Sequence, residues 1–159
     1  MTFSSMRFEG SLLHIHIAPA AGEPMCALDR ARLIEGVGIE GDRYATGRGY
    51  YSDRPDIREV TLIDEETLIA LRRDHDIDLA PVEHRRNLTT RHVPLNHLVG
   101  QRFSIGDVVL EGGRLNVPCK YLNELLGKNV FVPLLNRSGL NCRIIQGGSI
   151  RVGDTIAPL

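Results

Sequence analysis

The chain has 159 residues and a formal net charge of −1, because 19 lysines and arginines are balanced by 20 aspartates and glutamates. Aromatic residues make up 5% of it and tryptophan is absent. This composition argues against partners held by a general basic field, such as nucleic acid or a membrane surface, and offers little for stacking single-stranded nucleic acid.

The length predicts one domain over residues 1–159, since a chain of about 150 residues buries roughly 70% of its unfolded surface on folding. No apolar run reaches the roughly 18 residues of a membrane span, and "MTFSSMRFEG" does not resemble a signal peptide. We therefore expect a soluble cytoplasmic protein. Cys26, Cys119 and Cys142 form no C-x-x-C pair, which predicts single thiols instead of a disulfide framework or a four-thiolate zinc site.

The first predicted element is a strand in "SLLHIHIAP", where apolar residues alternate with His14 and His16 and a proline ends the run. Alternation with a period of two is typical of a half-buried strand. We interpret the two histidines as a pair facing solvent. Their spacing also suits zinc, but no third ligand is evident nearby in the sequence.

The middle of the chain predicts a helix between two strands. In "DEETLIALRRDHD", Asp64 is the expected N-cap, glutamates follow it and arginines come near the end, as the helix dipole favours. Leu68 and Leu71 are expected to face inward. "EVTLID" before the helix and "NLTTRHV" after it are typical of short strands.

The second half predicts strands around "GD" and "GG" turns, in "RFSIGDVVLEGGRLNV" and again in "CRIIQGGSIRVGDTIAP". Between them, Pro118 suits a first helical position and Gly127 a helix stop, which places Cys119 in the first turn. Many short strands without a regular alternation of strand and long helix favour a mainly β fold, a closed or partly closed β-barrel of mostly antiparallel strands with a few short helices.

Cys119 is the first candidate for chemistry. Unpaired backbone N–H groups and the positive end of the dipole at a helix start favour a thiolate, and Lys120 adds a cation. A thiolate attacks electrophiles, carries sulfur or binds a soft metal. The alternative is a small buried hydrophobic residue, which is a common role of free cysteine.

Two further segments carry charge. "VEHRRNLTTRH" concentrates Arg85, Arg86 and Arg91, which can bind phosphate or carboxylate through paired guanidinium contacts, or can mark a solvated edge strand. "GVGIEGDRYATGRGYY" contains Asp42 and Arg43 among glycines, but its spacing matches no phosphate-binding loop. By itself it is interpreted as a flexible loop.

Taken in order, six stretches resemble the MOSC domain, the family named after the C-terminal domain of molybdenum cofactor sulfurases. They are "GVGIEGDRY", "VTLIDEETL", "RRNLTT", "LVGQRFSIGDVVLE", "VPCKYL" and "NRSGLNCRIIQGGSIRVGDTI", which together run from about residue 36 to residue 156. The resemblance implies a β-barrel and a single stand-alone MOSC domain. It also places Cys119 on the cysteine for which the family is known.

The resemblance implies a site for molybdenum cofactor built around Cys119. One implied role is a thiolate ligand of molybdenum in the reduction of N-hydroxylated compounds by an external electron donor. The other is a persulfide-bearing sulfur carrier supplied by a cysteine desulfurase. Residues implied to hold molybdopterin are the following: Asp42, Arg43, Arg85, Arg86, Asn87, Arg91 and Lys120.

Two departures from the family pattern stand out. Tyr44 replaces the histidine of the common "GDRH" motif, and Ser138 stands where a glycine or another small residue is usual. The chain also has no counterpart of the aminotransferase-like domain of the sulfurases, so pyridoxal phosphate is not expected as its cofactor. Electrons or sulfur are expected to come from another protein.

Overall fold

The computed structural model describes residues 6–54 and 56–159. Its strands, in chain order, are β1 (Gly10–Ile17), β2 (Cys26–Leu28), β3 (Arg30–Ile34), β4 (Gly38–Ile39), β5 (Val60–Asp64), β6 (Leu88–Arg91), β7 (Arg102–Ile105), β8 (Val108–Leu115), β9 (Leu140–Gln146), β10 (Gly148–Arg151) and β11 (Thr155–Pro158). The helices are α1 (Arg43–Thr46), α2 (Glu65–His75), the 3-10 helix η1 (Leu95–Leu98) and α3 (Lys120–Leu126).

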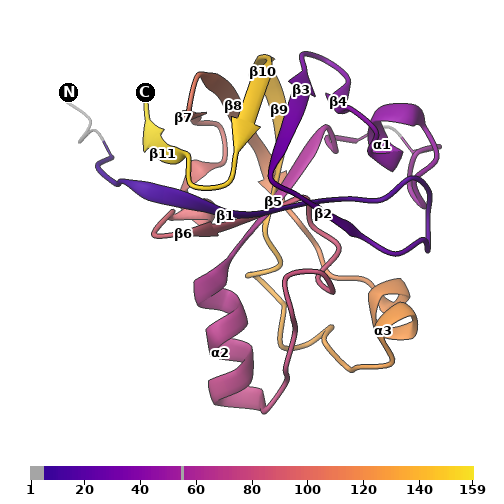
Figure 1. The fold of residues 1–159 in the computed structure, drawn as a ribbon. Helices are drawn as coiled ribbons and strands as arrows, with labels where there is room; N and C mark the ends of the chain where they lie inside the picture. The colour runs from indigo at the N-terminus through magenta and orange to yellow at the C-terminus, as the bar shows by residue number, and fades with distance from the viewer. Residues whose placement is uncertain (1–5, 55) are drawn as a thin grey trace.

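Seven strands close into a barrel in the order β11-β7-β8-β9-β5-β6-β1, and the pairing of β1 with β11 joins its ends (Figure 1). β2 extends the sheet beyond β1, and β10, β3 and β4 form a second small sheet. Among the named strands of the described residues, β5 and β6 are the one parallel pair. The predicted fold class, a mostly antiparallel β-barrel with short helices, is confirmed.

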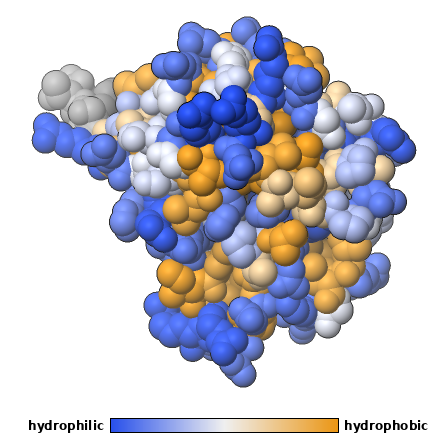
Figure 2. Space-filling model, viewed as in Figure 1, coloured by the Kyte–Doolittle hydropathy of each residue, from blue (hydrophilic) through white to orange (hydrophobic). Residues whose placement is uncertain are grey.

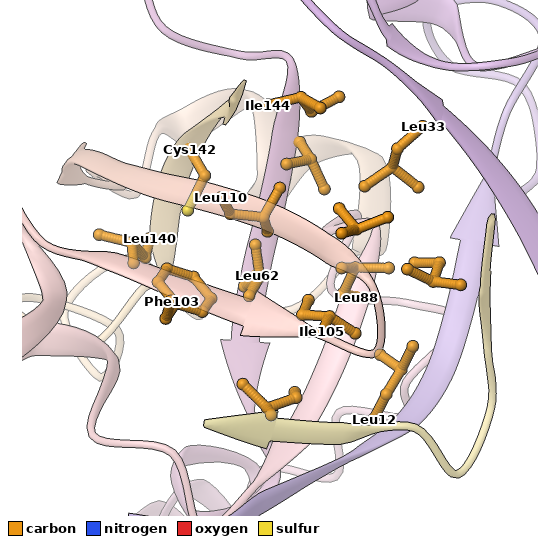
Figure 3. Close-up of a cluster of buried hydrophobic side chains, with 14 of the residues drawn as sticks. Leu12, Leu33, Leu62, Leu88, Phe103, Ile105, Leu110, Leu140, Cys142 and Ile144 are labelled. Atoms are coloured by element: carbon orange, nitrogen blue, oxygen red, sulfur yellow. The ribbon is translucent and has the colours of Figure 1, made fainter. Parts of the chain in front are cut away.

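The barrel encloses the main apolar core, in which side chains from facing strands meet (Figure 3). Leu62, Phe103 and Leu110 are fully buried there. Burying a leucine or phenylalanine contributes roughly 1.5–3 kcal/mol relative to leaving it exposed. Cys142 also lies in this core, where burial raises the pKa of its thiol. This thiol therefore packs as a hydrophobic residue.

A second apolar cluster joins the barrel wall to the helices that lie below it in Figure 1. Ile63 points outward from β5 and meets Leu68 and Leu71 of α2 and Leu122 of α3. The predicted helix, its N-cap residue Asp64 and its inward leucines are confirmed. Hydrophilic residues cover the far end of α2 (Figure 2). None of the helices in the described ranges has the length and apolarity needed to cross a membrane.

Strand β1 departs from simple alternation. Its register against β6 shifts between Leu12 and His14, so Leu12, Ile15 and His16 are all buried. The prediction that both histidines face solvent is therefore wrong for His16, although His14 is exposed. A β-bulge adds one unpaired residue and re-aims the side chains that follow it.

The first "GG" pair was also misjudged, because Gly112 and Gly113 lie inside β8 and form no turn. A Cβ atom on Gly112 would collide with the carbonyl of Leu98. The glycine therefore permits close approach of η1 to the barrel. The second pair is a corner, where the chain leaves β9 and enters β10 of the other sheet.

Candidate functional site

A cavity of about 450 Å³ lies against the outer side of the barrel wall. Cys119 lines it together with six arginines and four tyrosines, and these four are all the tyrosines of the chain. The arginines are Arg43, Arg54, Arg58, Arg85, Arg86 and Arg114, and the tyrosines are Tyr44, Tyr50, Tyr51 and Tyr121. Arginine and tyrosine together suit a ligand that is both anionic and planar.

The floor of the cavity is a polar row that crosses neighbouring strands. Arg114 of β8 pairs in register with Asn141 of β9, which pairs with Thr61 of β5. The next residues along these strands, such as Leu62, point into the barrel core. Strand alternation therefore gives this part of the wall an apolar inner face and a polar outer face.

Cys119 enters the cavity from the residue just before α3. It is the N-cap, with φ −133° and ψ 159°, so the helix begins at Lys120 and not at Pro118 as predicted. The thiol is partly exposed, and on one side it packs against the second apolar cluster. Cys26 is exposed on β2 and does not line this cavity.

Tyrosines surround this thiol. Tyr51 lies beside Cys119. Burial is the main cause that raises the pKa of the Tyr51 hydroxyl, and the hydrogen bond with the Cys119 thiol is the second. The hydroxyl therefore keeps its proton at neutral pH. Tyr50 stacks on Tyr121 of α3, with ring centroids 3.9 Å apart and an interplanar angle of 13°. This stack fastens the segment after α1 to the helix that follows Cys119.

Arg86 is held in the cavity wall by neutral oxygens. Its Nε donates to the Ser138 carbonyl at 3.0 Å, and one terminal nitrogen donates to Asn116 Oδ1 at 2.7 Å and Ser138 Oγ at 2.8 Å. The other terminal nitrogen donates to the carbonyl of His84 at 3.2 Å. Burial lowers the pKa of Arg86 to about 10, so the side chain remains a cation at neutral pH. Its charge lies near Cys119 while most of its donors are already used.

His84 fixes the turn that presents Arg85 and Arg86. Its Nδ1 accepts the backbone N–H of Arg86 at 2.9 Å, so Nε2 carries the proton and donates to Thr89 Oγ1 at 2.8 Å. Arg85 has φ 68°, a left-handed conformation that this local bond supports. Burial, with Arg86 nearby, lowers the pKa of His84 well below its ordinary value. The histidine is therefore a neutral structural support.

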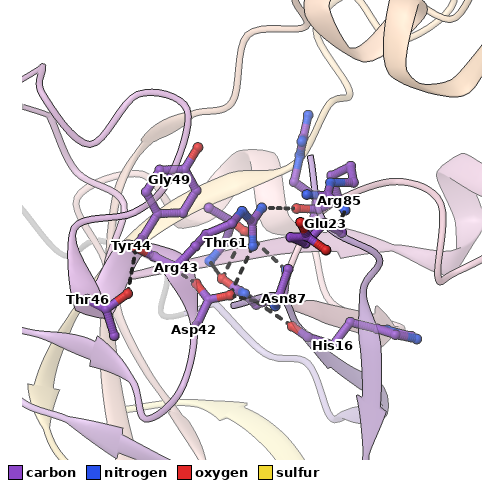
Figure 4. Close-up of polar contacts among 12 residues, drawn as sticks. His16, Glu23, Asp42, Arg43, Tyr44, Thr46, Gly49, Thr61, Arg85 and Asn87 are labelled. Atoms are coloured by element: carbon purple, nitrogen blue, oxygen red, sulfur yellow. Dashed lines mark hydrogen bonds and ion pairs between the residues drawn. The ribbon is translucent and has the colours of Figure 1, made fainter. Parts of the chain in front are cut away.

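Asp42 and Arg43 form a buried pair beside this turn (Figure 4). Arg43 donates to Asp42 Oδ1 at 2.9 Å and to the carbonyl of Arg85 at 3.0 Å. Asp42 also accepts from the backbone N–H of Tyr44 as the N-cap of α1. The segment interpreted as a flexible loop thus contains a capped helix, and Arg43 rather than Asp42 reaches the cavity.

Three other predicted residues do not line the cavity. Asn87 is fully buried, with its side chain bonded to Thr61 and to the carbonyl of His16. Arg91 pairs with Glu65 at 2.8 Å on an exposed surface. Lys120 is exposed at the start of α3. Asn87 therefore braces the wall, while Arg91 and Lys120 lie outside this lining.

Asp56 is the one carboxylate in the lining. It forms a two-pronged pair with Arg114, in which the Nε–Oδ1 distance is 2.8 Å. This hydrogen bonding lowers the pKa of Asp56 to about 2. Arg54 and Arg58 lie 5.6 Å and 5.4 Å from the centre of the Tyr51 ring. A second group of cations therefore lies around Tyr51.

A family model, described as the MOSC domain, matches residues 52–157. The chain belongs to the MOSC domain family. No curated protein shows a significant match to it.

Solved structures support the MOSC fold. The YuaD protein of Bacillus subtilis is 18% identical, with a TM-score of 0.81 and 96% of each chain covered. YiiM of Escherichia coli is 19% identical with a TM-score of 0.66, covering 98% of this chain and 70% of that one. YiiM of Geobacillus stearothermophilus is 12% identical with a TM-score of 0.70, covering 94% and 75%. At such identities the likeness concerns the fold.

Three of the stretches that resemble the MOSC family meet at the cavity, since "GDRY", "RRN" and "VPCKYL" supply Arg43, Arg86 and Cys119. Tyr44, which replaces the family histidine, also lines the cavity, and the Arg43 guanidinium lies 4.8 Å from its ring centre. Gly49 leaves room for this ring, because a Cβ atom there would collide with it.

Sequence reasoning missed the second half of the lining. Arg54, Arg58, Arg114 and the tyrosine pair at 50–51 belong to no recognised motif. The one available signal was the concentration of three tyrosines within residues 44–51 of a chain that has only four. Arg114 lies on β8, whereas Arg54 and Arg58 precede β5. Tertiary contacts such as the Arg114–Asp56 pair bring them together, and no local pattern reveals these contacts.

Proposed function

We propose that this MOSC protein binds molybdenum cofactor in the Cys119 cavity and reduces N-hydroxylated compounds with electrons from an external donor protein. The observation that carries the proposal is a partly exposed thiol inside a cavity lined by arginines and tyrosines. In the overall reaction, R–NHOH takes up two electrons and two protons and yields R–NH2 and water.

The donor set supports this assignment. The lining offers one sulfur donor, Cys119, which suits a soft metal that brings its remaining ligands with it. Molybdenum cofactor does so through the dithiolene of molybdopterin. Tyrosine rings suit the flat pterin, and arginine suits its phosphate. Cavities of about 300–1,000 Å³ hold ligands of this size class.

When bound, the cofactor supplies two-electron redox chemistry at the metal. Cys119 would hold the metal as a thiolate, the form that metal binding needs, and the cationic Arg86 lies nearby. Arg85 keeps its Nε and one terminal nitrogen without a hydrogen-bond partner in residues 6–54 and 56–159, so it can donate to a phosphate. Tyr51, whose hydroxyl keeps its proton, can orient a polar group beside Cys119.

The test is metal analysis of protein made in a host that synthesises the cofactor. We expect about one molybdenum per wild-type chain and almost none in Cys119→Ser. Cys26→Ser is the matched control, because Cys26 is exposed on β2 outside the cavity. It should retain its molybdenum. A Cys119→Ser protein that kept the metal would refute the ligand assignment.

A second candidate is a sulfur carrier, favoured by the accessibility of Cys119 and by its cationic surroundings. The Cys119 thiolate would take the outer sulfur from the persulfide of a cysteine desulfurase, which leaves the desulfurase as a thiol. Intact-mass measurement after incubation should find one added sulfur, removable by a reductant, in wild type and in Cys26→Ser. If Cys119→Ser acquires the same adduct, this candidate is wrong.

A further inference from the structure

The cavity has two cationic ends. Arg114 lies on β8, whereas Arg85 and Arg86 come just before β6. Two strands, β9 and β5, lie between β8 and β6. Three strand spacings amount to about 14 Å. The Arg86 guanidinium crosses this distance and donates to Asn116, just after β8, whereas Arg85 donates to the carbonyl of Glu23. Arg85 therefore marks one end of the cavity, and the arginines around Tyr51 and Asp56 mark the other.

The end near β8 retains unused cationic donors. Arg114 is occupied by the carboxylate of Asp56. Arg58 donates to the carbonyl of Arg54 at 2.8 Å and has only a 3.5 Å contact with Asp56. Arg54 donates no hydrogen bond and forms no ion pair within the part of the chain that the structure describes; its guanidinium lies over the Tyr51 ring. Three arginines therefore face one carboxylate at this end.

This end also opens to solvent. Arg54 and Asp56 are both exposed. The guanidinium groups of Arg54 and Arg58 lie over the ring of Tyr51, and Tyr51 lies beside Cys119. The two guanidinium groups are therefore separated from the thiol by a single side chain, that of Tyr51.

We propose that Arg54 and Arg58 bind an anionic group of the substrate, a carboxylate or a phosphate, and so select negatively charged N-hydroxylated compounds. This inference rests on the proposed reduction, in which the phosphate of the cofactor takes the Arg85 end. The uncharged end of the same substrate, which bears the N–OH group, then lies toward Cys119.

The experiment compares phenylhydroxylamine with its 4-carboxy, 4-phosphate and 4-trimethylammonium derivatives. Product amines are quantified with wild type, Arg54→Gln/Arg58→Gln and the control Arg143→Gln, whose arginine is exposed on β9. Wild type should favour both anionic compounds over the neutral one by roughly 10-fold or more in kcat/KM, the usual effect of a hydrogen bond to a charged group. The double variant should lose this preference, and the control should keep it.

Two further measurements separate this inference from the proposed function. Molybdenum content should be equal in wild type and the double variant, and its loss in the variant would mean that this end holds the cofactor and would overturn the inference. Calorimetric titration without an electron donor gives the Kd of the 4-carboxy compound even if no compound is reduced. The inference would also be overturned if the wild-type protein showed no preference for anionic compounds. The same holds if Arg143→Gln lost that preference as the double variant does.

Discussion

At the scale of single residues, the site depends on how Arg86 is held. Its guanidinium group donates four hydrogen bonds, all of them to neutral oxygens, and two of these oxygens belong to Ser138. No carboxylate in the described ranges forms an ion pair with it. A buried cation with neutral partners keeps its charge available to an anionic group nearby, and Arg86 lies near Cys119.

Ser138→Ala tests this arrangement. The change removes the hydroxyl that accepts from Arg86 at 2.8 Å and leaves a buried donor unsatisfied. We expect the free energy of unfolding to fall by about 1–3 kcal/mol, measured by urea denaturation. Ser104→Ala is the control, because its hydroxyl makes one 3.4 Å bond to a carbonyl. Equal losses in the two variants would contradict the special role of Ser138.

The basic segment indicates how far residue-level prediction reached. Its arginines were expected to act together, and Arg85 and Arg86 do line one cavity. Arg91 points to Glu65 on the outer surface instead, because it lies farther along β6. Strand register and the turn fixed by His84 determine which partner each arginine contacts. The charge pattern of the sequence reveals neither of them.

At the scale of elements, the segment between α1 and β5 is fastened to α3 by the Tyr50–Tyr121 stack. We expect Tyr50→Ala and Tyr121→Ala to be non-additive, with a coupling energy of about 0.5–1.5 kcal/mol in a double-mutant cycle. Urea unfolding of the four proteins supplies the values. Tyr44→Ala with Tyr121→Ala is a comparison pair that has no ring contact between its members. Additivity of the stacked pair would show that the stack contributes nothing.

Elements with strong local signals were predicted well. Helix α2 begins after Asp64 and buries Leu68 and Leu71 because its apolar spacing and terminal charges agree. Helix α3 was misplaced by two residues, since extended backbone at Cys119 delays its start. Backbone conformation at a helix boundary depends on tertiary packing, here against the second apolar cluster, and sequence propensity describes it poorly.

At the scale of the whole molecule, two buried histidines couple stability to pH. Burial lowers the pKa of His16, with His14 as a second cause, and burial lowers the pKa of His84. The unfolded chain therefore binds more protons than the folded chain below about pH 6.5. Their contribution to stability is complete above that pH and is lost as the pH falls below it.

We therefore expect the free energy of unfolding to decrease between about pH 7 and about pH 5, by at most about 1.4 kcal/mol per pH unit for each histidine. Urea unfolding at a series of pH values measures this slope. His97→Gln is the control, because His97 is exposed on η1 and should leave the slope unchanged. A flat profile in the wild-type protein would exclude this coupling.

The barrel class could be predicted from turn spacing and strand patterns, but its closure could not. The pairing of Gly10 with Ile156 joins opposite ends of the described chain, and the parallel alignment of β5 with β6 depends on α2 as a crossover. Neither contact leaves a local signature. The cavity lining likewise combines residues of β5, β8 and β9 with residues of distant loops, and no local pattern reveals that combination.

Closure by β1 and β11 also has a kinetic consequence. Contacts between residues so far apart raise the contact order, and barrels of this kind typically fold in milliseconds to seconds. Until β11 is in place, β1 and β7 each present an unpaired edge to which another chain can add. Pairing of β11 therefore closes the barrel on which the cavity is built. It also covers the two strand edges through which the nascent protein is most prone to aggregate.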